Sequence, residues 1–339
     1  MWMPPIVLRR VFLDPLVFII ALVGLVLSPI FFAGAFVADL FVPGRWKVLR
    51  IVKLVVTFMF YEVLGLITAF NLWLIAGFGR NIRTPRFRES HYAVLGWWIA
   101  AISRGVQSAL GLTIEFPKMP PIEGPVIVFS RHAGPGDSIF LAGTLLREFD
   151  RHPRIVGKKE LEFAPFFDVM GHRLPMRFIR PHPRQRELAL EAVRDAASGL
   201  GPTDAFVLFP EGGNYTPKRQ KSAIESLDRH GMTDQAEAAR ALNNLLPPHP
   251  SGALAAIEEA PDADVVFVAH TGTEDLTSLD VIWAGIPFDR TIKANYWHVE
   301  PDDIPAGVEA QTAWLYEQWE LIDTWIDENR DPVTREGAP

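Results

Sequence analysis

The residues best placed to do chemistry lie in one short stretch between Ser130 and Asp137. His132 is followed five positions later by Asp137, within a turn rich in glycine and proline. A carboxylate within hydrogen-bond reach of an imidazole fixes its tautomer and stabilises the imidazolium formed when the ring accepts a proton. We therefore interpret the pair as a general base with its orienting carboxylate, Asp137 lying at the N-cap of the next helix. The alternative is a solvent-facing loop histidine beside a structural cap.

Cations follow two further predicted strands. Lys158 comes directly after the strand at 154–157, and Arg180 directly after the strand at 176–179. Cations at strand ends close to helix N-termini can hold an anion such as phosphate. Each cation taken alone is more often a solvated surface charge, but their recurrence after successive strands favours an anion site.

A third stretch places a carboxylate directly before two glycines at the end of a predicted strand. An apolar strand leads to Glu211, which is followed by Gly212 and Gly213. Glycines allow the backbone to approach a ligand closely, and the carboxylate can accept a hydrogen bond from a substrate hydroxyl. The alternative is a carboxylate that caps the following turn.

From residue 124 onward, short apolar runs alternate with amphipathic segments. This alternation predicts an α/β domain with a central mixed, mostly parallel sheet flanked by helices. Open sheets of this kind bind ligands at the carboxyl ends of their strands. Strands are predicted at 125–129, 154–157, 176–179, 205–209, 264–269 and 291–297. Helices are predicted at 137–149, 160–170, 184–198, 220–230, 234–246, 251–260 and 309–327.

The N-terminal part differs from this pattern. Residues 15–38 carry no charge and residues 54–78 carry only Glu62, so each run reaches the ~20 residues that cross a bilayer. Pro29 is expected to kink the first helix. We predict a membrane-associated hydrophobic helical hairpin at 1–89, a catalytic α/β domain at 90–330 and a polar tail at 331–339.

Charge is divided unevenly along the chain. The net charge is −7, yet residues 1–90 contain ten Lys/Arg and four Asp/Glu and carry +6. A basic, apolar segment on an acidic body predicts contact with anionic lipid and no nucleic-acid partner. The three basic segments, 9–10, 45–53 and 80–88, all flank the apolar runs, so the positive-inside rule favours neither side. A hairpin dipping into one leaflet, with all three at one face, and two full spans both remain open. The segment 91–112, with Trp97 and Trp98, suits either the headgroup level or packing on the domain.

Several classes of site are disfavoured by the composition. The chain has no cysteine, which excludes disulfides and thiolate chemistry. No second histidine falls at helical ligand spacing and His-Glu-x-x-His is absent, so no metal is expected. Ser130 and Ser138 flank the histidine, but neither lies in a Gly-x-Ser-x-Gly elbow. His270, near the end of a predicted strand, is interpreted as a satisfied core histidine.

Three ordered motifs together resemble a known family. His-x4-Asp at His132 and Asp137, Phe-Ile-Arg at 178–180 and Phe-Pro-Glu-Gly at 209–212 resemble the glycerolipid acyltransferases, including 1-acyl-glycerol-3-phosphate acyltransferases. The resemblance spans about residues 90–300. The stretch after Glu211 is similar to the branch with the long eukaryotic-type lysophosphatidic acid and lysocardiolipin enzymes.

The resemblance implies a reaction and a role for each motif. His132 would deprotonate a lysophospholipid hydroxyl, most simply that of 1-acyl-sn-glycerol 3-phosphate, and the oxygen would attack the thioester of acyl-CoA or acyl carrier protein. The resemblance also implies that Lys158 and Arg180 hold the acceptor phosphate and that Glu211, with Gly212 and Gly213, positions the glycerol. The product would be phosphatidic acid, an intermediate of phospholipid biosynthesis. No cofactor is implied beyond the acyl donor. The alternatives are another lysolipid acceptor, or a membrane-anchored lipid-binding scaffold.

This chain departs from the family pattern at three places. Arg131 stands where the family often has asparagine, and Gly213-Asn214 replaces a frequent Thr-Arg, so that Lys218 or Arg219 would have to supply the missing cation. The fourth motif lacks its usual proline. The absence of cysteine and of a cleavable signal favours a catalytic domain facing the cytoplasm.

Overall fold

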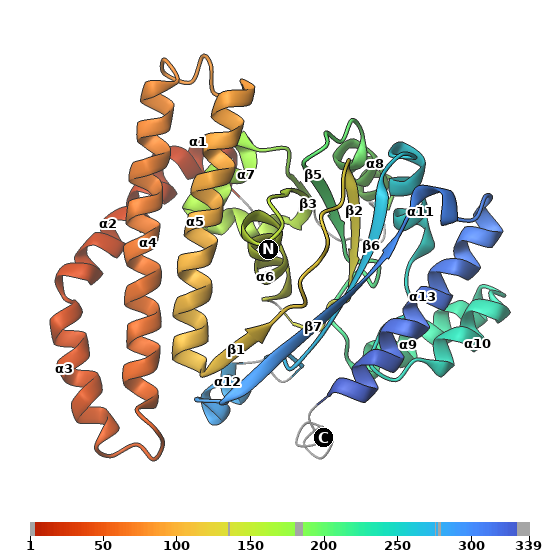
Figure 1. Ribbon diagram of the computed structural model, residues 1–339. Helices are drawn as coiled ribbons and strands as arrows, with labels where there is room; N and C mark the ends of the chain where they lie inside the picture. Colours follow the sequence, from red (N-terminus) through yellow and green to blue (C-terminus); the bar gives the residue numbers. More distant parts are fainter. Residues whose placement is uncertain (1–3, 135, 180–185, 275, 277–278, 331–339) are drawn as a thin grey trace.

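The computed structural model describes residues 4–134, 136–179, 186–274, 276 and 279–330. Its centre is a seven-stranded sheet in the order β1-β7-β6-β2-β5-β3-β4 (Figure 1). The five strands β2 to β6 run parallel to one another, whereas β1 and β7 pair in parallel with each other and run in the opposite direction, so that β7 is antiparallel to β6. The predicted class, a mixed and mostly parallel sheet flanked by helices, is confirmed. The strands are β1 (Leu112–Glu115), β2 (Val126–Ser130), β3 (His152–Lys158), β4 (Arg177–Ile179), β5 (Asp204–Leu208), β6 (Asp264–Thr271) and β7 (Arg290–Val299).

Six of these strands were predicted to within a few residues, and β1 was not. Four residues with alternating burial give too short a pattern for a strand to stand out from the end of the preceding helix. The helices after β2 are α6 (Asp137–Arg147), α7 (Pro165–Arg173), α8 (Arg186–Ala197), α9 (Pro217–Arg229), α10 (Thr233–Ala241), α11 (Pro250–Glu259), α12 (Leu279–Gly285) and α13 (Val308–Asn329). Of these, α12 was missed, and the segment predicted as one helix at 160–170 is a 3-10 turn (Lys159–Phe163) followed by α7.

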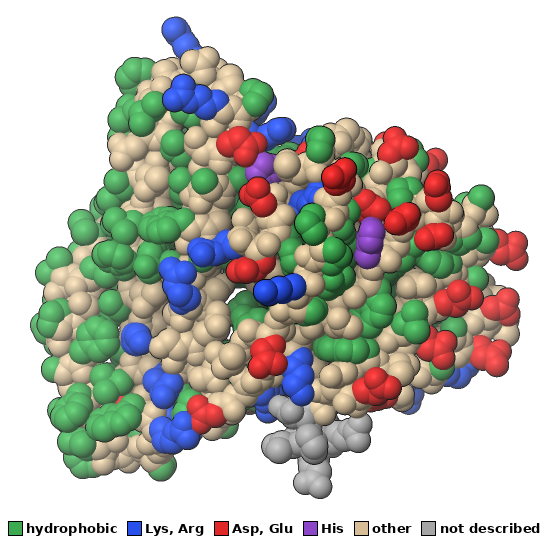
Figure 2. Space-filling view, viewed as in Figure 1, with side chains coloured by type: hydrophobic (Ala, Val, Ile, Leu, Met, Phe, Trp, Pro, Cys, Tyr) green, Lys and Arg blue, Asp and Glu red, His purple; other side chains and the backbone are tan. Residues whose placement is uncertain are grey.

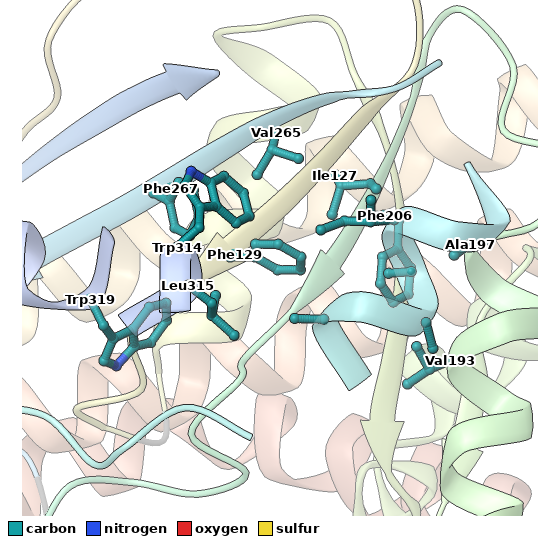
Figure 3. Close-up of a cluster of buried hydrophobic side chains, with 14 of the residues drawn as sticks. Ile127, Phe129, Val193, Ala197, Phe206, Val265, Phe267, Trp314, Leu315 and Trp319 are labelled. Carbon is teal, nitrogen blue, oxygen red and sulfur yellow. The ribbon is translucent and has the colours of Figure 1, made fainter. Parts of the chain in front are cut away.

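The strand side chains pack into two hydrophobic cores, one on each face of the sheet. Along β2, Ile127 and Phe129 face one core while Val126 and Val128 face the other, as the two-residue period of a strand requires. The first core is closed by α8, α11 and α13, with Trp319 fully buried against it (Figure 3). The second is closed by α5 (Pro85–Leu110), α6 and α7.

The N-terminal part consists of helices joined by short turns, with no strand among its described residues. It comprises α1 (Ile6–Leu8), a π-helical segment (Arg9–Leu13), α2 (Asp14–Val26), α3 (Ser28–Asp39) and α4 (Lys47–Ile75). The first apolar run bends by 62° between α2 and α3, directly before Pro29, as expected from the missing backbone donor. By length and composition, α4 can cross a membrane, and the bent pair qualifies if it counts as one span.

The helix α5 joins the two parts of the molecule. It runs without a break through residue 89, where we had placed the domain boundary, and packs along α4 on one side and α6 on the other (Figure 1). Trp98 is buried in the second core and Trp97 is partly exposed. Of the two interpretations left open for this segment, the structure shows packing on the domain.

The three basic segments do not share one face. The 29 residues of α4, about 43 Å long, separate Lys47 at one end from the segment 80–88 beyond the other. Lys47 donates to the backbone carbonyls of Trp283 and Ala284. Exposed hydrophobic side chains cover the surface over α2, α3 and α4, whereas carboxylates gather on the opposite side of the molecule (Figure 2).

A buried cluster of charges, which we call the N-terminal clamp, ties the first helices to the catalytic domain. Arg9 is buried and its guanidinium lies 3.0 Å from a carboxylate oxygen of both Glu162 and Asp168. Arg10 lies 3.2 Å from Asp168. His172 presents its Nδ1 to Asp168 at 3.0 Å and its Nε2 to Glu162 at 3.4 Å. The first of the basic segments is therefore paired inside the protein.

Candidate active site

The site lies where β2 ends, at the edge of the sheet that carries the carboxyl ends of its parallel strands. His132 follows β2 by two residues and is largely buried. Its Nδ1 lies 3.2 Å from Oδ2 of Asp137, and its ring packs on Phe209 with centroids 4.7 Å apart. Within the described part of the chain, no hydrogen bond is made by Nε2. The ring is thus held on one side and free on the other, as a general base requires.

Asp137 is the first residue of α6 and does not cap it, contrary to our expectation. The N-cap residue is Gly136. Oδ2 of Asp137 instead accepts the backbone N–H of Gly134 at 2.6 Å, which closes the turn onto the carboxylate that holds His132. Burial raises the pKa of Asp137, but the nearby His270 and the bonds from His132 and Gly134 outweigh it, so that the pKa lies below its usual value. The carboxylate is therefore charged at neutral pH.

Glu211 is buried and holds two loops together. Its Oε1 accepts the backbone N–H of His132 at 2.7 Å, and its Oε2 accepts that of Leu246 at 3.0 Å. Burial raises the pKa of Glu211 to about 8, although the charge of Arg131 and both backbone bonds act in the opposite direction. The structure thus shows a residue that positions the base. Its expected contact with the substrate glycerol stays a prediction.

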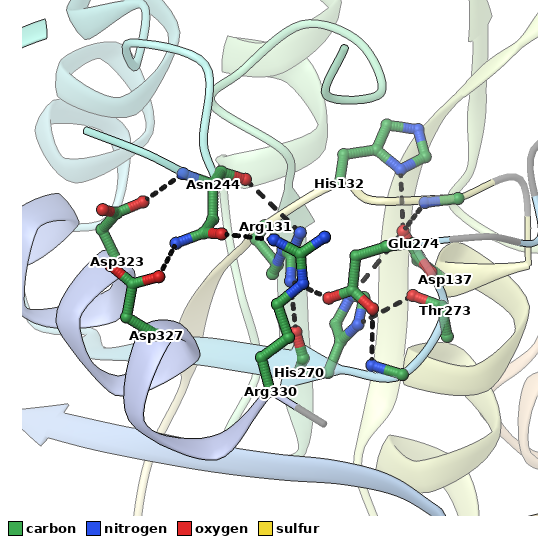
Figure 4. A network of polar contacts seen from close by, with 12 residues as sticks. Arg131, His132, Asp137, Asn244, His270, Thr273, Glu274, Asp323, Asp327 and Arg330 are labelled. Carbon is green, nitrogen blue, oxygen red and sulfur yellow. Dashed lines mark hydrogen bonds and ion pairs between the residues drawn. The ribbon is translucent and has the colours of Figure 1, made fainter. Parts of the chain in front are cut away.

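Arg131, where we had noted a departure from the family pattern, is fully buried behind the dyad. It donates to the backbone carbonyl of His270 at 2.5 Å and to Oε1 of Glu274 at 2.9 Å (Figure 4). Burial raises the pKa of Glu274, but the arginine charge dominates and brings that pKa to about 2. The pair joins the end of β2 to the loop after β6.

The remaining predicted ligand-binding residues fall into two groups. Gly212 and Gly213 lie in the turn after Glu211, where Gly212 has a φ of +68° that favours glycine. The guanidinium of Arg219 lies against Gly213 and donates to the carbonyl of Asn214 at 3.0 Å. A cation from α9 therefore stands beside this turn.

Lys158 is exposed at the end of β3, two strands or about 10 Å along the same edge from β2. It thus lies on the predicted edge of the sheet without touching the dyad. The predicted phosphate ligand Arg180 lies outside the described residues.

An apolar pocket borders the dyad between α6 and the β6–β7 side of the sheet. Asp137 and His270 line it together with Ser130, Phe140 and Val268. A second pocket shares Phe116, Leu141 and Val268 with the first and continues toward the far end of α6. Together they form an apolar lane that begins at the Asp137 carboxylate.

The dyad is not part of a metal-ligand cluster among the described residues. The one such cluster found there consists of Glu162, Asp168 and His172, where Arg9 already supplies the positive charge. The expectation that no metal acts at the site stays a prediction.

A histidine–aspartate pair at the carboxyl edge of an α/β sheet is an arrangement suited to general-base chemistry. Residues 111–271 match the family model described as Acyltransferase, so this part of the chain is an acyltransferase-family domain. The family that the three motifs resembled is thereby confirmed. None of the curated proteins matches the chain. A similar solved structure is that of the 1-acyl-sn-glycerophosphate (LPA) acyltransferase PlsC from Thermotoga maritima, with 16% sequence identity and a TM-score of 0.45 over 79% of this chain and 97% of that one.

Sequence reasoning missed one residue of the site. His270 is buried, but it is not the satisfied core histidine we had expected, since no described residue is a hydrogen-bond partner of its Nε2, which lies 3.7 Å from Oδ2 of Asp137. Its position at the end of β6, beside β2 in the sheet, was the available signal.

Proposed function

We propose that this protein is a membrane-associated lysophospholipid acyltransferase, most simply one that converts 1-acyl-sn-glycerol 3-phosphate to phosphatidic acid. The observation that carries the proposal is the His132–Asp137 pair within an acyltransferase-family domain, with Nε2 of the histidine left free. Acyl-CoA or acyl carrier protein is the donor, and no other cofactor takes part.

In the proposed reaction, Nε2 of His132 accepts the proton of the acceptor hydroxyl while the oxygen attacks the thioester carbonyl. Asp137 stabilises the imidazolium through Nδ1. When the carbon–sulfur bond breaks, the imidazolium returns the proton to the departing sulfur, which leaves as a free thiol. General-base catalysis of this kind contributes ~10²–10⁴-fold, and the orientation of two bound substrates contributes the rest.

The acceptor phosphate is proposed to bind along the edge of the sheet. Lys158 is exposed there, and Arg180 follows the next strand in the sequence. Arg219 replaces the cation that is missing after Glu211, because its guanidinium lies beside Gly213. We expect Arg219→Gln to raise the KM for a phosphate-bearing acceptor several-fold and to leave that for the acyl donor unchanged. An equal rise for both would remove Arg219 from the acceptor site.

The acyl chain is proposed to occupy the apolar lane that begins at Asp137. Ala294 of β7 lines this lane from the side opposite α6. Ala294→Leu is therefore expected to shift the preferred donor toward shorter acyl chains, measured as kcat/KM over a series of acyl-CoA lengths. A uniform loss for all lengths would place the chain elsewhere.

Membrane contact is proposed for the exposed apolar surface of α2 to α4. Val26 and Ile30, at the bend of the first apolar run, are 74% and 66% exposed. We expect Val26→Asp with Ile30→Asp to reduce flotation with anionic vesicles, whereas Leu188→Asp on α8, an exposed control, does not. Unchanged flotation of the double variant would exclude this surface. We place the catalytic domain on the cytoplasmic side; whether the helices span or re-enter is a separate question.

The experiment that tests the function is an acyl-CoA assay on the detergent-solubilised protein. A panel of lysolipids and glycerol 3-phosphate is supplied, and free thiol and product mass are measured, with His132→Ala as control. Turnover with one acceptor that is lost in the variant supports the proposal and identifies the headgroup. Binding of lysolipid without turnover, with both acyl-CoA and acyl carrier protein as donor, would contradict it and favour a lipid-binding scaffold.

A further inference from the structure

His270 lies on the opposite side of Asp137 from His132. Its Nε2 is 3.7 Å from the same carboxylate oxygen, Oδ2, that faces Nδ1 of His132 at 3.2 Å. The two imidazoles come from segments 138 positions apart in the sequence, and they meet because β6 pairs with β2. One carboxylate is therefore bracketed by two histidine rings (Figure 4).

The surroundings of His270 define its protonation. Its Nδ1 lies 3.3 Å from Oγ1 of Thr273, a hydroxyl that can donate to it and so leave the ring proton on Nε2. The charged groups that face the ring are Asp137 from α6, Arg131 after β2 and Glu274 in its own loop. Burial, with the charge of Arg131, lowers the pKa of His270 despite the two carboxylates. The ring is thus neutral at pH 7 and directs an N–H toward Asp137.

A core histidine with a purely structural role would have its polar atoms satisfied. Nε2 of His270 is buried and lacks a hydrogen-bond partner among the described residues, while 3.7 Å is too long for a hydrogen bond. Catalytic hydrogen bonds are often long in the absence of substrate and shorten when it binds. An unpaired donor that faces the orienting carboxylate fits such a contact.

We propose that His270 is a positioning residue of the acyl transfer and acts through Asp137. As substrate binds, the His270 N–H forms a hydrogen bond to Oδ2 of Asp137. This bond holds the carboxylate toward His132 and offsets part of the carboxylate's negative charge. The expected effect on catalysis rests on the proposed function. The coupling between the two histidine rings does not.

Two variants separate this role from packing. His270→Ala removes the donor, and His270→Gln keeps a donor nitrogen at a similar reach. We expect His270→Ala to lower kcat roughly ten- to hundredfold, as loss of positioning does, with the acceptor KM unchanged and with kcat largely restored in His270→Gln. His298→Gln is the matched control, because His298 lies on the neighbouring strand β7 and pairs with Asp264 at 3.0 Å.

A second measurement does not depend on turnover. The titration of His132 is followed by NMR of histidine-labelled protein in detergent micelles, with His132→Ala to assign its signal. Even at 3.7 Å the N–H dipole of His270 offsets part of the charge of Asp137. Its loss in His270→Ala is therefore expected to raise the His132 midpoint by about half a pH unit. His270→Gln and His298→Gln should titrate like the wild type.

Two outcomes would overturn the proposal. One is a His270→Ala protein whose kcat and His132 midpoint both match the wild type. The other is a His270→Gln protein as impaired as His270→Ala, which would assign the effect to packing. A wild-type protein without turnover on any acceptor would defeat the proposed function, while the NMR midpoint would still decide whether the rings are coupled.

Discussion

Two buried charge clusters in this protein contain the same residue types but differ in how their histidine is held. The N-terminal clamp joins Arg9 to carboxylates and a histidine, and the active site joins Arg131 to Glu274 beside His132 and Asp137. In the clamp, both ring nitrogens of His172 face carboxylates. At the site, His132 presents only Nδ1 to one.

The difference lies in what each cluster leaves its histidine able to do. A histidine held between two carboxylates is stabilised as a cation and has no lone pair to offer. The hydrogen bond that His172 donates to Asp168 raises the pKa of His172 accordingly, against the effect of burial. A histidine held by one carboxylate keeps a free nitrogen that can accept a proton. The residue types are alike in the two clusters, and the free nitrogen is the feature that separates them.

The largest contrast is expected when the same substitution is made in both histidines. His132→Gln should lower kcat by ~10²–10⁴-fold, because the proton acceptor is lost. His172→Gln should leave kcat within about twofold, since this ring lies outside the site. Free-thiol release under saturating substrates measures both. Similar losses in the two variants would break the distinction.

Removal of the clamp arginine should affect stability instead. Arg9→Met leaves Glu162 and Asp168 buried with less compensation, and breaking a buried pair in this way costs about 3–5 kcal/mol. We expect a lower unfolding midpoint in denaturant, with kcat per folded molecule retained. Lys221→Met, on the exposed face of α9, is the matched control. A stable variant that has lost turnover would move Arg9 into the catalytic machinery.

A pH dependence is expected from the ion pair at the site. The folded pKa of Glu274 is about 2, below its ordinary value of 4.5. The stabilisation is therefore complete above pH 4.5 and is lost as the pH falls toward 2, amounting to roughly 3 kcal/mol. Glu274→Gln should flatten this acid limb of the unfolding free energy. An unchanged limb would show that other carboxylates cause it.

The smallest effect is expected from the clamp histidine, with the opposite sign in pH. Because the folded pKa of His172 is raised, its stabilisation is present below its ordinary pKa of 6.5 and is lost as the pH rises through the folded value. The ring is about a third exposed, so the contribution is under about 1 kcal/mol. The stability difference between wild type and His172→Gln, measured across this pH range, should shrink as pH rises.

Much of the fold could be predicted because its signals are local. The apolar run that forms β2 is bounded by a turn and followed by a helical period, so the strand, the turn and α6 all follow from neighbouring residues. The His132–Asp137 pair was predictable for the same reason. The strand β1 was not, because its four residues are identified as a strand only by pairing with β7.

The rest of the site depends on contacts between distant segments. Glu211 accepts one hydrogen bond from the backbone of His132 and one from that of Leu246, and His270 approaches Asp137. These contacts arise from strand order, which one sequence does not reveal. Arg131 illustrates the point, since a departure from the family pattern at this position becomes intelligible only when Glu274 is beside it.

The pairing of β1 with β7 has a consequence for the order in which the chain acquires its structure. The helices α1 to α5 are complete once residue 110 has been synthesised, whereas β1 gains its partner only when residues 290–293 emerge. The sheet that buries one side of α5 is dominated by such long-range pairings, which form slowly. During synthesis the apolar helices therefore exist before the sheet on which α5 will pack. On the ribosome, the nascent chain presents its apolar helices first and completes the α/β domain last.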